Sequence, residues 1–129
     1  MASWTDVAGL ALSLPETTER ADREGLRTWA VRDQMFAWER PLRPSERESL
    51  GNDVPSGPIL GVRVADLATK KVVLTAGPAS CFTTPHFDGY STLLVSLDDI
   101  SLEDLDKLIL EAWLARAPTW LASACLSSE

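Results

Sequence analysis

The stretch Phe82-Thr83-Thr84-Pro85-His86-Phe87-Asp88-Gly89-Tyr90 holds the only histidine and the only tyrosine of the 129-residue chain, and two of its three phenylalanines. Aromatic rings beside short polar groups are unusual for an ordinary solvent loop. Pro85 constrains the backbone, and Asp88-Gly89 predicts a tight turn because Gly89 can adopt a positive φ. The apolar run Thr92-Leu93-Leu94-Val95 follows at once. We therefore expect a constrained aromatic loop that leads into a buried strand.

Alternating apolar and polar residues predict four strands on either side of this loop. Pro41 ends the second strand because proline has no N–H to donate to a ladder, and Asp33-Gln34 is the predicted hairpin connection before it. The polar segment 16–24 is expected to be a loop, residues 44–50 a short helical turn, and the Pro- and Gly-rich segment 52–58 a flexible connection. The four predicted strands are residues 26–32, 35–40, 59–65 and 92–97.

Capping patterns predict a helix near each end of the chain. Ser3 and Asp6 match a capping box, and the helix that they begin ends before Pro15. Ser101 and Asp104 match the same pattern further along. The later helix carries one apolar stripe, which is formed by Leu102, Leu105, Leu108, Ile109, Ala112 and Trp113.

Residues 66–77 fit two predictions. Asp66 can cap a helix over residues 67–76 that Gly77 ends. The run Val72-Val73-Leu74 is rich in β-branched residues and equally fits a strand that pairs with the strand before it. Propensity alone does not decide between the two.

Helices at both ends of the chain, with an antiparallel sheet between them, predict the α+β class as a single domain over residues 1–129. No apolar stretch reaches the roughly 20 residues that span a bilayer, and the N-terminus lacks the pattern of a signal peptide. Cys81 and Cys125 stand far apart, which is unlike a disulfide framework. We therefore expect a cytoplasmic protein that does not enter a membrane.

The formal net charge of −7 is unevenly distributed along the chain. Residues 27–71 carry eight bases and six acids, whereas residues 72–129 carry eight acids and two bases. Binding along a phosphate backbone depends on clustered Lys and Arg, so the acidic chain as a whole disfavours broad contact with nucleic acid. Only the middle third offers a basic face.

The sequence gives little support for catalysis. Cys81 and His86 are close enough in sequence to form a nucleophilic pair, but Cys81 fits a small buried hydrophobic residue more simply. His86 and Asp88 supply at most two metal ligands, and no glycine-rich phosphate cradle is present. We expect no catalytic residue, no metal site and no cofactor.

The arginines and aromatic rings fit three interpretations, two of which are binding sites and one of which is purely structural. Arg binds phosphate bidentately and rings stack on bases, so one reading is a nucleic-acid surface with Arg27, Arg32, Arg40 and Arg63 as its contacts. Another is a polar and aromatic pocket around residues 82–90 for a small molecule or a protein segment, lined by Trp38, Glu39, Arg40, Thr84, His86, Asp88 and Tyr90. In the third reading, the rings simply fill the core while the arginines stay in solvent.

Four motifs together resemble the MmcQ/YjbR family: Phe36-Ala37-Trp38-Glu39-Arg40-Pro41, Gly61-Val62-Arg63-Val64, residues 82–90, and Glu111-Ala112-Trp113-Leu114-Ala115-Arg116-Ala117-Pro118. The resemblance covers residues 7–121. It implies a frataxin-like (CyaY-like) α+β fold with a double-wing arrangement, and it favours the helix over residues 67–76. It also implies a non-enzymatic module that binds double-stranded DNA. Metal handling comes from the fold analogy with frataxin alone.

Overall fold

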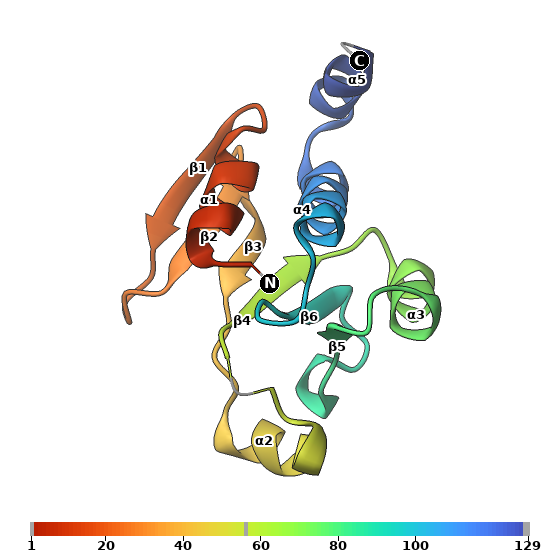
Figure 1. Ribbon diagram of the computed structural model, residues 1–129. Helices are drawn as coiled ribbons and strands as arrows, with labels where there is room; N and C mark the ends of the chain where they lie inside the picture. The colour runs from red at the N-terminus through yellow and green to blue at the C-terminus, as the bar shows by residue number, and fades with distance from the viewer. Residues whose placement is uncertain (1, 56, 128–129) are drawn as a thin grey trace.

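The structure is a computed structural model that describes residues 2–55 and 57–127. Within these residues, one six-stranded antiparallel sheet and five α-helices form an α+β fold, as predicted (Figure 1). The strands are β1 (Thr17–Ala21), β2 (Arg27–Val31), β3 (Gln34–Glu39), β4 (Ile59–Arg63), β5 (Cys81–Phe82) and β6 (Thr92–Ser96), in the spatial order β1-β2-β3-β4-β6-β5. The α-helices are α1 (Trp4–Leu12), α2 (Pro44–Leu50), α3 (Leu67–Ala76), α4 (Leu102–Arg116) and α5 (Thr119–Ser127), and the short 3-10 helices are η1 (Gly51–Asp53) and η2 (Pro85–Phe87). Among the described helices, none combines the length and the hydropathy that crossing a bilayer requires.

Side-chain caps begin the two helices that the sequence predicts near the chain ends. Ser3 Oγ accepts a hydrogen bond from the Asp6 N–H (3.3 Å), and the Asp6 carboxylate accepts one from the Ser3 N–H (2.9 Å). Ser101 Oγ accepts from the Asp104 N–H (3.1 Å) at the start of α4. Each cap satisfies an N–H that has no partner within its helix, so both predicted starts are confirmed.

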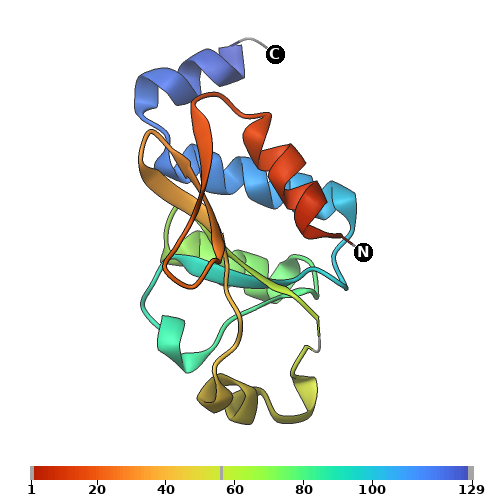
Figure 2. The same ribbon diagram turned by 90° about the vertical axis from the view of Figure 1, so that its left-hand side faces the viewer.

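The main core lies between one face of the sheet and the helices α1 and α4, which pack against each other and against the strands (Figure 2). Trp29 and Trp113 are among its largest fully buried side chains. Both indoles keep a hydrogen-bond acceptor: Trp29 Nε1 donates to Glu19 (2.9 Å), and Trp113 Nε1 donates to the Pro15 carbonyl (3.1 Å). Neither ring therefore loses a hydrogen bond when it is buried.

The opposite face of the sheet, called the second face below, carries a smaller core near α2 and η2. Strands β4 and β6 are buried on both faces, because Leu60 and Leu93 join the main core while Ile59 and Leu94 join the smaller one. Successive side chains of a strand point to opposite faces, which explains why both strands read as continuous apolar runs. The buried members of the smaller core are Leu42, Ile59, Phe87 and Leu94.

Next to this smaller core, the second face is built around Trp38 and Gly61, which are cross-strand partners. A Cβ atom on residue 61 would lie 2.6 Å from the Trp38 indole, closer than packing allows. Glycine therefore lets the ring lie against the backbone of β4. Arg63 lies two residues further along β4 and faces Thr92 of β6 across the ladder, so it shares this face.

The prediction of a loop over residues 16–24 is wrong, because β1 is a strand at the edge of the sheet. It pairs with β2 over its full length. Four of its five side chains are exposed, so the sequence has no apolar alternation that would reveal a strand. Charged residues such as Glu19 and Arg20 are typical of edge strands, which must avoid pairing with other molecules.

The hairpin between β2 and β3 turns one residue earlier than predicted. Arg32 and Asp33 both have positive φ values, 46° and 70°. Positive φ at both central residues is what a two-residue type I′ connection requires. The turn is therefore Arg32-Asp33, and Gln34 already belongs to β3.

The ambiguity over residues 66–77 is resolved in favour of a helix. Asp66 accepts a hydrogen bond from the Thr69 N–H (2.7 Å) and caps α3. The alternative strand at residues 72–74 is therefore wrong. The edge strand β5 follows α3 and pairs with β6, although two residues are too few to give a periodic signal in the sequence.

We predict that Trp113→Ala lowers the free energy of unfolding by about 3–5 kcal/mol, because it leaves a cavity in the main core and frees the Pro15 carbonyl. Chemical denaturation followed by circular dichroism measures this change. Trp120→Ala is the matched control, because Trp120 is 59% exposed on α5 and its truncation should change stability by less than about 0.5 kcal/mol. Equal midpoints for the two variants would contradict this view of the core.

Candidate functional site

The loop over residues 82–90 is a chain of short hydrogen-bonded turns. The Phe87 N–H donates to the Thr84 carbonyl (2.9 Å), which forms η2. The Tyr90 N–H then donates to the Phe87 carbonyl (3.0 Å) across Asp88-Gly89, where Gly89 has a φ of 81°. The predicted tight turn is therefore confirmed, and it requires glycine at its positive-φ position.

Lys70 of α3 fixes one side of the 82–90 loop. Its side chain is buried, and Nζ donates to the carbonyls of Phe87 (2.7 Å) and Tyr90 (2.9 Å). Burial lowers the pKa of Lys70, and the charge of Asp88 offsets this in part. Sequence reasoning missed this role, because no pattern distinguishes Lys70 from the exposed Lys71 beside it.

Glu46 of α2 fixes the other side of the loop. Its buried carboxylate accepts hydrogen bonds from Thr84 Oγ1 (2.9 Å), Arg40 Nη2 (3.0 Å) and the Arg43 N–H (2.8 Å). Burial raises the pKa of Glu46, but these hydrogen bonds and the charge of Arg40 outweigh it and hold the pKa below its ordinary value. The Arg40 guanidinium also lies 5.1 Å from the centroid of the Phe87 ring.

These two anchors decide which side chains of the loop face inward. Thr84 and Phe87 are buried, whereas His86, Asp88 and Tyr90 are exposed. The seven residues proposed for a pocket therefore do not converge on one cavity. Arg40 and Thr84 do meet, through Glu46.

A separate groove of about 670 Å³ lies beside the β1–β2 hairpin. Trp38, Glu39 and Arg40 line this groove, together with Arg23 and Arg43, whereas the exposed side chains of the 82–90 loop do not. The groove thus holds three of the seven predicted pocket residues. Two arginines that the sequence did not single out accompany them.

Three of the four predicted DNA-contacting arginines are paired with glutamates. Arg27 pairs with Glu39 and lies 5.6 Å from the Trp4 ring centroid. Arg32 pairs with Glu16 (2.7 Å) and lies 5.3 Å from the Trp120 ring centroid. Arg40 pairs with the buried Glu46 (3.0 Å). These three positive charges are therefore largely compensated within the protein.

Arg63, the fourth predicted arginine, differs from the other three in its interactions. It has no ion-pair partner among the described residues, and its guanidinium lies 5.3 Å from the Trp38 ring centroid. Its Nη1 donates to Thr92 Oγ1 (3.2 Å), while its buried Nε has no hydrogen-bond partner in the described structure. Burial lowers the pKa of Arg63, and the positive charge of Arg116 lowers it further. Neither Arg63 nor Arg116 has an ion-pair partner among the residues that the structure describes.

The nucleophilic pair considered from the sequence is poorly arranged. Cys81 is buried in the main core, and burial together with the charge of Asp104 raises the pKa of its thiol to about 11. The thiol is therefore protonated at neutral pH and is a weak nucleophile. His86 is exposed, with its ring edge-on to Phe87 at 4.9 Å. The side chain of Cys125 lies outside the described residues.

Comparison of the sequence with known proteins identifies a matching family model and similar proteins. A family model described as YjbR matches residues 12–115. Proteins described as uncharacterized, from Mycobacterium bovis and from two strains of Mycobacterium tuberculosis, are 47% identical over 132 aligned residues. The alignment covers 100% of this chain and 99% of each relative. No solved structure matches the chain.

We predict that Glu46→Gln lowers the free energy of unfolding at neutral pH by about 1–3 kcal/mol, because Arg40 then lacks its charged partner. The pKa of Glu46 is depressed in the folded state, so the stabilisation by its charge is complete above its ordinary value of 4.5. That stabilisation is lost as the pH falls through the lower pKa of the folded protein. The difference between wild type and Glu46→Gln should therefore shrink in acid, as denaturation at a series of pH values would show.

Glu48→Gln is the control for this prediction, because Glu48 lies on the same helix and is exposed. It should leave stability within about 0.5 kcal/mol of wild type at every pH. A Glu46→Gln variant that behaves like Glu48→Gln would show that the carboxylate does not hold the loop.

Proposed function

This chain belongs to the YjbR family, and we propose that it is a non-enzymatic module that binds the phosphate backbone of double-stranded DNA through the second face of its sheet. The observation that carries this proposal is the state of Arg63. A half-buried positive charge is costly unless an anion compensates it. Arg63 lacks a carboxylate partner among the described residues, while Arg116 adds a like charge. Phosphate is an anion that guanidinium groups bind bidentately.

Trp38 links Arg63 to further cations. The indole lies beside Arg63 and also lines the groove that contains Arg23 and Arg43. Neither of these arginines has an ion-pair partner among the described residues. Arg23, Arg43 and Arg63 thus mark a path for a phosphate backbone, with an aromatic ring at its centre.

Carboxylates limit the extent of this path. Asp22 and Glu24 also line the groove, although Asp22 Oδ1 is engaged by the N–H groups of Glu24 (2.9 Å) and Leu26 (3.0 Å). A net charge of −7 adds long-range repulsion of DNA. We therefore propose contact with few phosphates and a shallow dependence on salt. The frataxin-like, double-wing description of the fold stays a prediction from the family resemblance.

We predict that a fluorescently labelled DNA duplex binds at low salt and that Arg63→Gln weakens this binding on every duplex sequence. Loss of one phosphate contact should also reduce the slope of log affinity against log salt by about 1. Fluorescence anisotropy over a salt series measures both effects.

Arg32→Gln is the control for the DNA experiment, since the charge of Arg32 is already paired with Glu16 (2.7 Å). It should bind the duplex almost as wild type does. The proposal fails if wild type shows no binding at low salt. It also fails if Arg32→Gln weakens binding as much as a folded Arg63→Gln does.

The rigidity of the 82–90 loop favours a second candidate function, the recognition of a small molecule or a protein segment by its exposed side chains. Lys70 and Glu46 hold the loop from two sides, so His86, Asp88 and Tyr90 are presented on a fixed backbone. Binding residues are often carried by loops that a rigid scaffold positions. In this case, the ligand would meet an exposed surface rather than the closed pocket that the sequence suggested.

We predict that His86→Ala and Tyr90→Ala leave the thermal midpoint close to that of wild type, because both side chains are exposed. Thr84→Val should lower it, because it leaves the buried Glu46 carboxylate short of one donor. Thermal unfolding followed by circular dichroism compares the three variants. A large loss for His86→Ala would mean that this imidazole supports the loop and is not free for a ligand.

A further inference from the structure

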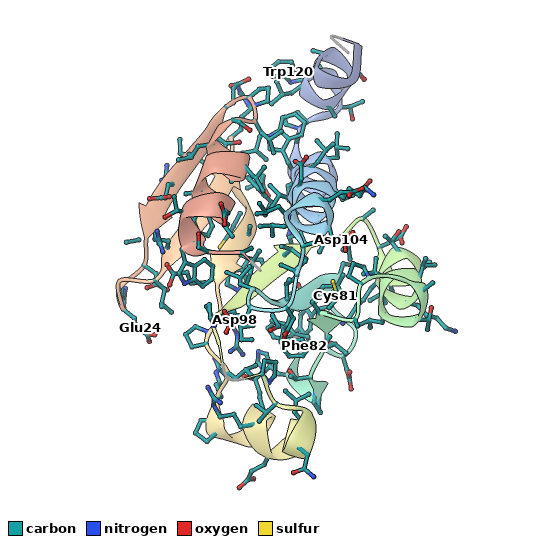
Figure 3. All side chains as sticks on the ribbon, viewed as in Figure 1. Glu24, Cys81, Phe82, Asp98, Asp104 and Trp120 are labelled. Carbon is teal, nitrogen blue, oxygen red and sulfur yellow. The ribbon has the colours of Figure 1, made fainter. Side chains whose placement is uncertain are left out.

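An apolar groove of about 320 Å³ lies between α3 and α4, and its lining includes neither Trp38 nor Arg63. Its floor is formed by side chains such as Val73 of α3, Pro78 and Leu108 of α4. Figure 3 shows Asp104 between these two helices, with Cys81 beneath. This groove belongs neither to the proposed DNA path nor to the 82–90 loop.

Helix α3 is unusually exposed for its apolar composition. Among its ten residues, only Lys70 is fully buried, and that side chain points to the 82–90 loop. Leu67 is 50% exposed and Val72 62% exposed. Most helical stability in proteins comes from the packing of an apolar face. The groove lies along the side of α3 that carries Thr69 and Val73, so this is the part of the helix that a bound partner would cover.

The rim of the groove is acidic. Asp104 and Glu111 both line it from α4, and neither has an ion-pair partner among the described residues. They are seven residues apart, which is two helical turns and about 10 Å along the axis. Lys107 lies between them, and its Nζ is directed to Glu103 (3.4 Å).

We propose that this groove is a docking site for a basic amphipathic helix of another protein. A groove between two helices accepts a third helix through apolar side chains spaced at i, i+3, i+4 and i+7. Two carboxylates separated by two turns match two Lys or Arg side chains at positions i and i+7 of that helix. A second copy of this chain is a poor occupant, because its net charge of −7 repels the acidic rim.

The test uses a designed helical peptide of about 18 residues, since shorter isolated helices are marginal in water. Its apolar face is Leu and Ala, and its polar face carries Lys at i and i+7. A second peptide has Glu in place of each Lys. Titration into the full-length, isotopically labelled chain, followed by NMR, gives both the affinity and the residues that respond. We expect shifts on α3 and α4 with the Lys peptide and none with the Glu peptide.

Matched variants separate groove binding from general attraction to an acidic protein. Val73→Thr places a hydroxyl in the groove at nearly constant shape and should weaken binding about tenfold. Val72→Thr makes the same change on the exposed neighbour and should have no effect.

For the rim, Asp104→Asn with Glu111→Gln should weaken binding roughly fivefold at low salt. Asp106→Asn removes a carboxylate from the side of α4 that faces α1 and leaves the Glu103–Lys107 pair intact, so it should change binding much less.

Three results would overturn the proposal. The first is an absence of shifts on α3 and α4. The second is equal weakening by the groove variants and by their controls while all remain folded. The third is dimerisation of the chain, measured by analytical ultracentrifugation, that Val73→Thr abolishes, because the occupant would then be a second copy.

Discussion

The buried carboxylate of Glu46 joins its own segment, residues 40–46, to the 82–90 loop, because Thr84 lies 38 positions along the chain from Glu46. It receives hydrogen bonds from the residue that follows β3, from the start of α2 and from the 82–90 loop. Burying a carboxylate in a residue that is only 3% exposed is costly unless hydrogen bonds and an opposite charge compensate it. Its three donors meet that requirement, and they hold α2 and η2 over the smaller core. The packing of α2 and η2 on the second face of the sheet therefore depends on this one group.

The helices and central strands could be predicted because local signals agree with the fold. Ser3 and Ser101 are caps, and the apolar stripe through Trp113 faces the main core as its spacing indicates. Strands β4 and β6 are apolar on both faces because both faces are covered. Strand β1 could not be predicted, because an exposed edge strand buries neither face and its sequence therefore shows no alternation of apolar and polar residues.

The candidate site was less predictable, because it depends on tertiary contacts between residues that are far apart in the sequence. The sequence correctly singled out the aromatic 82–90 loop and the tight turn at Asp88-Gly89. It gave no sign that Lys70 and Glu46 would be buried to hold that loop, since both residue types are usually exposed. The four arginines also looked equivalent in sequence. Only the positions of Glu16, Glu39 and Glu46 show that three are compensated and that Arg63 is not.

The ends of the sheet restrict how this protein can associate. At one end, β5 is only two residues long and α3 lies outside it (Figure 1). At the other, β1 is an exposed strand with charged side chains. Short, covered or charged edges are the usual protection against strand-to-strand pairing. Copies of the chain are therefore kept from adding to one another's sheets, and a concentrated solution should resist forming fibrils.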